Sequence, residues 1–254
     1  MILIVGDTHD DVLYFETVLV GKDEQLLFNR FRVRSGSIAS QQVLVVHNMS
    51  TSTLAAASIT ELINYLDKQE QVVDLVICVG KCLSGCNNLK HGDIALSGSV
   101  IDANVDLSKL KDVGLAEIPG FSREFPSDFK VQEDICRYLS ENLERRPNID
   151  HYRTTYLSSD NLSLDMVKFL KEHNTLFGKS DEKYVIDANS AGVAIACTLK
   201  DIPFVCLKVV EASLDQAQNL DTYSKVLSRY IDLGKGIVQT LSNIGRTDIL
   251  EGDE

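Results

Sequence analysis

Side chains that can exchange protons, bind anions or hold metals gather in four polar segments, each directly after an apolar run of the chain. These segments are residues 6–11, 47–53, 80–86 and 210–215. Carboxylates and imidazoles can work as acids and bases, a lysine ammonium can bind an anion, and thiolates can bind metal ions. The four segments are therefore where chemistry is expected in this sequence.

The cysteines are the first candidates for a metal site. Cys78, Cys82 and Cys86 recur every four residues, but a zinc site needs a second cysteine pair or histidines, and no such pair follows. The spacing also differs from the common iron–sulfur runs. Cys197 and Cys206 lie in apolar runs typical of a core. We expect reduced thiols, no metal and no cofactor.

The elements that must position these segments alternate between strands and helices. Apolar runs predict strands over residues 1–6, 43–47, 72–79, 93–97 and 203–210, with a loop from Gly80 to about Gly92. Alternation places Arg30, Arg32 and Arg34 on one face of a further strand. Helical periodicity predicts helices from Val12 and over residues 54–66, 132–143, 164–172, 187–199 and 222–241. This alternation predicts an α/β fold, with a mostly parallel or mixed central sheet between two layers of helices. In such sheets ligands bind beyond the carboxyl ends of the strands, where the four polar segments lie.

Length, charge and composition narrow the class of protein. With 254 residues, 44% of them hydrophobic, and no Ser/Gly/Pro-rich linker, the chain is expected to form one domain over residues 1–254. The net charge of −12 argues against binding nucleic acid or an anionic membrane, since both need a basic face. No apolar run reaches about 18 residues, and the apolar start lacks a basic flank. A cytoplasmic protein is expected.

Three stretches carry a resemblance to a known superfamily. Residues 76–85 followed by 89–94 are similar to a strand, a glycine-rich loop and an "L-K-x-G-D-I" strand at the same spacing. Residues 187–197 are similar to an "E-M-E-A-A-A-I-A" helix, and residues 202–215 to "V-P-F-V-V-V-R-A-I-S-D-x-A-D". With residues 6–12 as the first loop, their order resembles the superfamily of purine nucleoside phosphorylases and methylthioadenosine/S-adenosylhomocysteine nucleosidases. The resemblance implies a small-molecule nucleoside as ligand and a homodimer or larger homo-oligomer.

The resemblance also assigns roles to positions, several of which carry another residue type here. The Asp that protonates the purine N7 aligns with Ala212, and Glu211 stands just before it. The carboxylate that activates the attacking water aligns with Asp11, one methylene shorter. The helix Glu that binds the ribose hydroxyls aligns with Asn189, which can still donate and accept hydrogen bonds.

These alignments predict a catalytic pair, because cleaving an N-ribosidic bond needs a proton donor for the base and a group that activates the nucleophile. We expect Glu211 as the acid and Asp11 as the base. Alternatively, Glu211 is an ordinary polar residue at a strand exit, and Asp11 is a favourable charge at a helix start. Since neighbours in a strand point to opposite faces, Glu211 can replace an acid at position 212 only if the chain has left the sheet there.

The remaining candidates are predicted to bind the ligand: Asn189, Lys81, Met49, Ser159, Asp160, Asp215 and His9. Lys81 either binds an anion or is a solvated lysine, and His9 is either a proton carrier or an exposed loop residue. Ser159 and Asp160 fall where the resembled family has "S-G-D" near the base, with a turn and helix cap as the alternative. Asp215 is a second candidate acid.

Three functions follow as hypotheses. The first is an N-ribosyl hydrolase acting on a purine nucleoside or thionucleoside. The second is a family member without catalysis that binds a nucleoside or a partner subunit. The third is a phosphorylase, which is disfavoured because the two positions where phosphorylases hold phosphate with arginine are Asp10 and Cys78 here.

Overall fold

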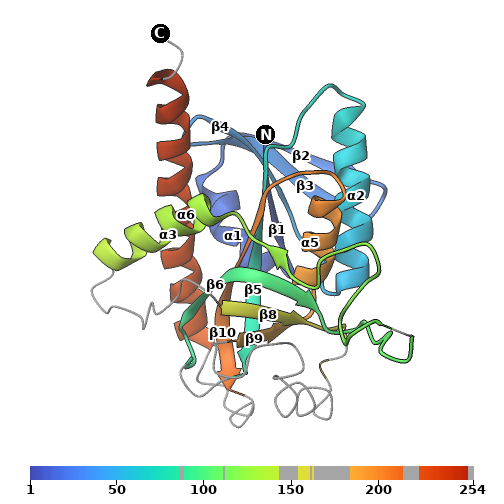
Figure 1. Cartoon of the computed structure of the whole chain (residues 1–254). Helices are drawn as coiled ribbons and strands as arrows, with labels where there is room; N and C mark the ends of the chain where they lie inside the picture. Colours follow the sequence, from blue (N-terminus) through green and yellow to red (C-terminus); the bar gives the residue numbers. More distant parts are fainter. Residues whose placement is uncertain are drawn as a thin grey trace.

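A ten-stranded mixed sheet forms the middle of the molecule, and helices cover both of its faces (Figure 1). The computed structural model describes residues 1–85, 89–110, 112–142, 154–160, 162, 184–213 and 223–250. The predicted α/β class with a mixed central sheet is confirmed. The strand pairings divide the sheet into an open half and a closed half.

The open half extends from β5 and contains the start of the chain. Strand β1 (Ile2–Gly6) lies between β4 (Gln41–Val46) and β5 (Leu75–Ser84), parallel to both. All five residues of β1 are buried, as expected for a strand covered on both faces. Beyond β4, the antiparallel strands β3 (Phe31–Ile38) and β2 (Val20–Leu27) complete this half.

The closed half is a ring of five strands that begins and ends at β5. Around the ring, β5 pairs with β10 (Phe204–Ser213), β10 with β6 (Ile94–Asp102), β6 with β8 (Thr154–Ser158), and β8 with β9 (Tyr184–Asp187). Strand β9 then pairs with the end of β5 and closes the ring. The short β7 (Phe125–Pro126) adds to β6. Strand β5 extends past Gly80 to Ser84, because its end pairs with β9 and β10. The prediction that a loop begins at Gly80 is therefore wrong.

Two layers of helices enclose the sheet. On one face lie α2 (Ser52–Asp67) and α5 (Ser190–Thr198), and on the other α1 (His9–Val18), α3 (Phe129–Asn142) and α6 (Tyr223–Leu250) (Figure 1). Each layer packs on its own cluster of buried apolar side chains. The central strands are therefore screened from water on both sides, and their carboxyl ends are where polar groups can reach a ligand.

Helix starts differ from the predictions by up to three residues, and two of the differences have local reasons. Helix α1 begins at His9 and not at Val12, because Thr8 precedes the first turn and its backbone N–H donates to the Asp11 carboxylate. The helix predicted over residues 187–199 begins at Ser190, because Asp187 still belongs to β9. The helix predicted over residues 164–172 lies outside the described residues, and strands β2, β7, β8 and β9 were not predicted.

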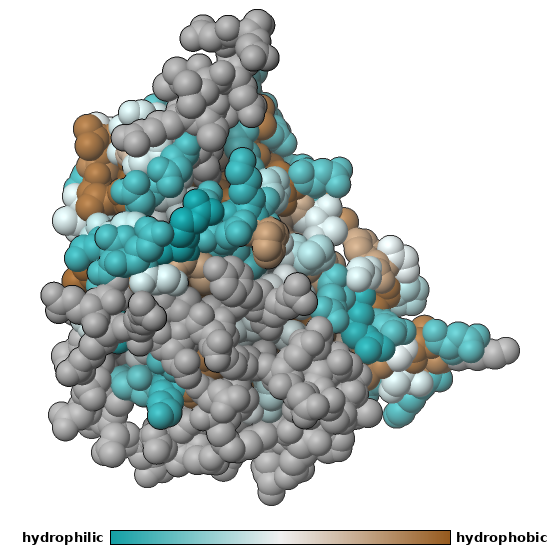
Figure 2. Space-filling model, turned by 60° about the vertical axis from the view of Figure 1, so that its left-hand side comes forward, coloured by the Kyte–Doolittle hydropathy of each residue, from teal (hydrophilic) through white to brown (hydrophobic). Residues whose placement is uncertain are grey.

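The surface adds little to the assignment of a site. Figure 2 shows a face on which hydrophilic side chains cover much of the described surface, while hydrophobic side chains occur in small separate groups. Among the described helices, none has the length and apolar character needed to cross a membrane.

Candidate active site

The polar segments that follow β1 and β4 meet the middle of β10 at one edge of the sheet. The backbone N–H of Met49 donates to the carbonyl oxygen of Gly6 at 3.3 Å and joins the first two segments. Strand β10 brings Lys208 opposite Gly80 of β5. This edge is the carboxyl end of β1 and β4, where the strand-end rule places a ligand.

A buried ionic cluster occupies this edge. The fully buried Lys208 places its Nζ 2.6 Å from Asn189 Oδ1 and 3.4 Å from a carboxylate oxygen of both Asp7 and Asp187. Burial acts to lower the pKa of Lys208, but its interactions with Asp7, Cys78, Asp187 and Cys206 together raise it. Ser190 Oγ also donates to Asp187 Oδ2. Lys208 is therefore a fixed positive charge between two negative ones.

Asp7 is the member of this cluster that reaches the surface, with 20% of its side chain exposed. Its Oδ1 accepts hydrogen bonds from Asn189 Nδ2 and from Lys208, while Oδ2 accepts none from the described residues. Burial raises the pKa of Asp7 to about 6, although the charge of Lys208 opposes the shift. Gly80 makes room for the pair, since a Cβ there would lie 2.8 Å from Lys208 Nζ and 3.0 Å from Asp7 Oδ2.

Asn189 connects the cluster to the segment after β4. Its Nδ2 donates to Asp7 Oδ1 and, at 2.8 Å, to the carbonyl oxygen of Met49, while its Oδ1 accepts from Lys208. Both amide hydrogens are thus used within the protein, and the side chain is fully buried. The Met49 side chain is fully buried in the cluster beneath α2 and α5. Contact of either residue with a sugar stays a prediction, and the geometry gives Asn189 a role in holding Asp7.

Asp11 is a buried carboxylate whose two oxygens differ in their hydrogen bonding. Its Oδ2 accepts from Thr8 N at 2.7 Å and from Thr8 Oγ1 at 2.9 Å, which stabilises the first turn of α1. Its Oδ1 is buried and accepts no hydrogen bond from the described residues. Burial raises the pKa of Tyr230 on α6, and the Asp11 carboxylate raises it further through its charge and its side-chain contact with the Tyr230 hydroxyl. The helix-start role and the predicted role as a base are therefore compatible in one side chain.

Glu211 lies at an irregular point of β10. The pairing with β5 passes from Val210–Cys82 to Ala212–Leu83 and leaves Glu211 without a partner on β5. A bulge of this kind re-aims a side chain, so strict alternation along the strand does not apply at Glu211. Glu211 is half-exposed, and its Oε1 lies 3.9 Å from Nζ of Lys81. This pair is the second charged group at the strand ends.

The two charged groups lie near the same stretch of β5, which carries Gly80 opposite Lys208 and Lys81 beside Glu211. The buried thiol of Cys82 is close enough to sense both of them. Burial raises its pKa well above the ordinary value, the charges of Asp187, Asp7 and Glu211 act in the same direction, and Lys208 opposes them. Among the described residues, no hydrogen bond or ion pair joins Asp7 and Asn189 to Lys81 and Glu211.

Ser159 and Asp160, predicted near the base, are engaged within the protein. The Asp160 carboxylate accepts from the backbone N–H of Ser52 at 2.5 Å and from Thr53 Oγ1 at 2.8 Å, at the start of α2. This is the helix-cap alternative that the sequence left open. Ser159 is fully buried and donates from Oγ to Asn104 Oδ1 at 3.0 Å. A contact of either residue with the base stays a prediction.

His9 and Asp215 complete the predicted set. His9 Nε2 lies 2.9 Å from Glu16 Oε2, and its ring centroid lies 5.3 Å from that of His47. The buried Glu16 also pairs with Arg34 of β3, so His9 belongs to a charged group that joins α1 to β3. Asp215 lies outside the described residues. No described group of three or more His, Cys, Asp or Glu side chains is arranged to hold a metal ion.

Sequence reasoning missed Asp7, Lys208 and Asp187 as site residues. One signal was available, because Lys208 is a single charge within the apolar run 203–210. A strand covered on both faces seldom carries an unpaired lysine, so such a charge indicates a buried partner. The identity of that partner depends on the pairing of β10 with β5, which local patterns do not reveal.

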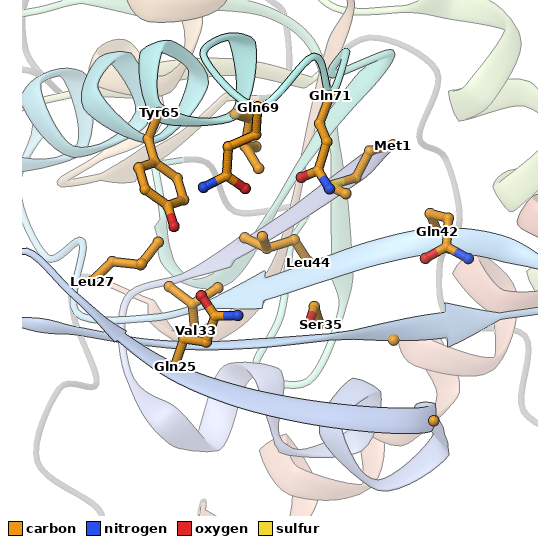
Figure 3. Close-up of a pocket in the computed structure, with 13 residues that line it drawn as sticks. Met1, Gln25, Leu27, Val33, Ser35, Gln42, Leu44, Tyr65, Gln69 and Gln71 are labelled. Atoms are coloured by element: carbon orange, nitrogen blue, oxygen red, sulfur yellow. The ribbon is translucent and has the colours of Figure 1, made fainter.

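A cavity of about 220 Å³ lies at the opposite end of β1, between the last turn of α2 and the strands of the open half (Figure 3). Its lining includes Met1 at the start of β1 and Tyr65, Gln69 and Gln71 from the end of α2 and just beyond it. Glutamine, serine and apolar side chains predominate there, without a carboxylate or imidazole to exchange a proton. The cavity is therefore separate from the strand-end groups.

Comparisons with known proteins identify the family of the chain. Residues 2–241 match the sequence profile of the family described as the phosphorylase superfamily. The 5′-methylthioadenosine/S-adenosylhomocysteine nucleosidase of an Exiguobacterium species is 23% identical over 217 residues, which cover 85% of this chain and 87% of the relative. The corresponding nucleosidase of Bacillus pumilus is 24% identical over 188 residues, covering 73% of this chain and 74% of the relative.

Solved structures show the same arrangement of the chain. A 5′-methylthioadenosine/S-adenosylhomocysteine nucleosidase from Neisseria meningitidis, in complex with methylthio-immucillin-A, superposes with a TM-score of 0.79 at 17% identity, covering 95% of this chain and 98% of the other. Futalosine hydrolase of Helicobacter pylori gives a TM-score of 0.76 at 17% identity, covering 95% and 97%. At these identities the likeness shows the fold.

Proposed function

The chain belongs to the phosphorylase superfamily, as its sequence predicted, and on that premise we propose that it hydrolyses the N-ribosidic bond of a purine nucleoside or thionucleoside. Relatives and structural neighbours named as nucleosidases and as a futalosine hydrolase support a hydrolase. The observation that carries the proposal is the buried carboxylate of Asp11 at the carboxyl end of β1, whose Oδ1 accepts no hydrogen bond from the described residues.

In the proposed reaction the bond between C1′ of the sugar and N9 of the purine breaks, and its electron pair stays on the base. Glu211 gives a proton to N7 of the leaving base. A water oxygen forms the new bond to C1′, and the proton that the water loses goes to Asp11 Oδ1. The bulge at Glu211 and its half-exposed side chain support its role as the proton donor.

The charges at the strand ends favour water over phosphate as nucleophile. A phosphorylase must neutralise a dianion, for which arginine forks are the usual means. Here Asp7 and Asp11 are adjacent carboxylates, Cys78 is a buried thiol, and Lys81 is already paired with Glu211. Phosphate would meet repulsion in this region, so we propose hydrolysis as the reaction.

The test is to incubate the purified protein with adenosine, inosine, guanosine and 5′-methylthioadenosine, with and without phosphate, and to measure free base and sugar by chromatography. If the proposal is correct, free base and free sugar are released at the same rate with and without phosphate. Phosphate-dependent formation of ribose 1-phosphate would establish the phosphorylase alternative. Nucleoside binding in a calorimeter without any release of base would establish the non-catalytic alternative.

We also propose that the chain is one domain that works as a homodimer or larger homo-oligomer in the cytoplasm, with a site that has diverged from its relatives. The family match over residues 2–241 supports the single domain. Light scattering after gel filtration measures the assembly, and cell fractionation measures the location. A monomer at micromolar concentration would contradict the proposed assembly.

A further inference from the structure

We propose that Asp7 binds the hydroxyl groups of the ligand's sugar through Oδ2, which accepts no hydrogen bond from the described residues. This inference rests on the proposed nucleoside ligand and adds to it the group that selects a ribose. The structure gives four reasons: the unused oxygen of Asp7, the full use of Asn189, the rigidity of the surrounding cluster and its charge.

The first reason is the hydrogen-bonding state of Asp7. Both bonds that it accepts from described residues, from Asn189 Nδ2 and Lys208 Nζ, end on Oδ1. Oδ2 remains, on a side chain that is 20% exposed. A carboxylate oxygen can only accept hydrogen bonds when ionised, so the matching ligand group is a donor such as a sugar hydroxyl.

The second reason is that Asn189 could bind the sugar hydroxyls only by breaking hydrogen bonds within the protein. Its two amide hydrogens go to Asp7 and to the carbonyl oxygen of Met49, and its Oδ1 accepts from Lys208. It is also fully buried. Asn189 therefore positions Asp7, and Asp7 is left as the group that can face the sugar.

The third reason is that the cluster fixes the direction of the Asp7 carboxylate. Lys208 is held in turn by Asp187, whose Oδ2 lies 3.4 Å from Nζ. Gly80 closes the arrangement, because a Cβ at this position would lie 3.0 Å from Asp7 Oδ2 and 2.8 Å from Lys208 Nζ. A fixed acceptor loses little conformational freedom when a ligand binds, which favours recognition of a defined diol.

The fourth reason is the charge of the cluster. Asp7 and Asp187 carry two negative charges against the one positive charge of Lys208, so one negative charge is left when both acids are ionised. A sugar that loses its base becomes positively charged at the ring. A carboxylate held against the sugar therefore attracts the transition state more than the ground state.

The test compares wild type with Asp7→Asn on adenosine, 2′-deoxyadenosine and 3′-deoxyadenosine. The control is Asp23→Asn, which removes an exposed carboxylate from β2 far from the strand-end groups. Because a hydrogen bond to a charged group contributes about 10- to 100-fold, Asp7→Asn is expected to lower kcat/KM for adenosine by that factor. The loss should shrink to less than about threefold on the deoxy substrate that lacks the contacted hydroxyl. Asp23→Asn should leave all three values unchanged.

An equal loss on all three substrates, or no loss on any, would overturn the assignment of Asp7. Asp7→Glu is a second variant for the case that Asp7→Asn fails to fold, because it keeps the negative charge beside Lys208. Circular dichroism measures whether each variant is folded. If Asp7→Asn is unfolded, Asp7→Glu should be folded and discriminate less between adenosine and its deoxy analogues; unchanged discrimination would contradict the inference.

The failure of the proposed function gives a different pattern. If wild type releases no base, titration calorimetry with the same three nucleosides replaces the kinetics. Tighter binding of adenosine than of a deoxy analogue, lost in Asp7→Asn, would support Asp7 while rejecting hydrolysis. Absence of binding, or binding with no preference for hydroxyls, would overturn both the ligand and the role of Asp7.

Discussion

Two regions at the same edge of the sheet hold their charges in opposite ways. Around Asp7, Lys208 and Asp187, each charge is wholly or largely buried and meets more than one partner. Around Lys81 and Glu211, two partly exposed side chains share one ion pair at 3.9 Å. We call these regions the buried cluster and the exposed pair. The buried cluster has its geometry before a ligand arrives, whereas the exposed pair can rearrange around one.

The difference separates the energetic roles of the two regions. Removing the partner of a buried charge strongly lowers the free energy of unfolding, because the remaining charge has neither a partner nor water around it. An exposed pair contributes little to stability, because water replaces either partner. We therefore expect the free energy of unfolding to depend on the buried cluster, and the exposed pair to affect mainly the catalytic rate.

The largest effect is expected from Lys208→Met, which leaves Asp7 and Asp187 facing each other without their shared cation. Removing one partner of a buried ion pair typically costs about 3–5 kcal/mol of unfolding free energy. Urea denaturation followed by circular dichroism measures the change. A loss below about 1 kcal/mol would mean that the cluster is open to water and that the comparison is wrong.

Next comes Glu211→Gln, which keeps the shape of the side chain but removes its proton-donating group. If Glu211 is the acid, kcat should fall by about 10²- to 10⁴-fold while the unfolding midpoint stays near that of wild type. Steady-state kinetics and a melting curve on the same preparation measure both. Full activity in Glu211→Gln would assign proton donation to another residue.

Asp11→Asn should affect both properties at once. Loss of the proposed base should lower kcat by a similar factor of about 10²–10⁴. Because Asp11 Oδ2 also accepts from Thr8 at the start of α1, some loss of stability should accompany it, about 0.5–2 kcal/mol by the usual effect of helix caps. Loss of both activity and stability in Asp11→Asn would distinguish Asp11 from Glu211, whose variant should lose activity only. If Glu211→Gln lost stability and Asp11→Asn did not, this distinction would be wrong.

The pH dependence should show opposite signs for stability and for binding. The pKa of Asp7 rises from 3.8 to about 6 on folding, so the folded state holds this proton more tightly and loses stability as pH rises from about 4 to 6. Over the same window, adenosine binding should strengthen as the carboxylate ionises. Lys208, Asp187 and Asp11 face Asp7 and remain in Asp7→Asn, in which both trends should flatten. A pH profile unchanged by Asp7→Asn would assign the trends to other groups.

The smallest effect is expected from Lys81→Met at the exposed pair. The loss of stability should be about 0–1 kcal/mol, the usual range for pairs in contact with water. Urea denaturation beside Lys208→Met makes the contrast direct. A loss as large as that of Lys208→Met would show that the 3.9 Å pair is as important to the fold as the buried cluster.

Much of the fold was readable from the sequence, because the central elements carry strong local patterns. Apolar runs predicted β1, β4 and β10. Together with the rule that ligands bind beyond strand ends, they indicated the edge of the sheet at which the polar groups lie. Strands β8 and β9 have only five and four residues, too short for a periodic signal, and were missed.

The site was readable only where one segment carries the information. Glu211 could be named as a candidate from its own segment, but the bulge that re-aims it depends on the register between β10 and β5. Asp160 bonds to Ser52, 108 residues earlier, and Lys208 lies opposite Gly80. Such contacts are set by tertiary pairing, so local patterns could not reveal that Asp7 and Lys208 would meet.

The ring of strands ties the assembly of the site to the order of synthesis. Asp7 is made early, and its cation Lys208 follows 201 residues later. At about 5–20 residues per second on a ribosome, the carboxylate waits roughly 10–40 seconds for that partner. Strand β10 must also enter between β5 and β6, a pairing of high sequence separation that is slow to form. A nascent chain that stops short of residue 208 is therefore expected to lack this site, so activity should appear only late in synthesis.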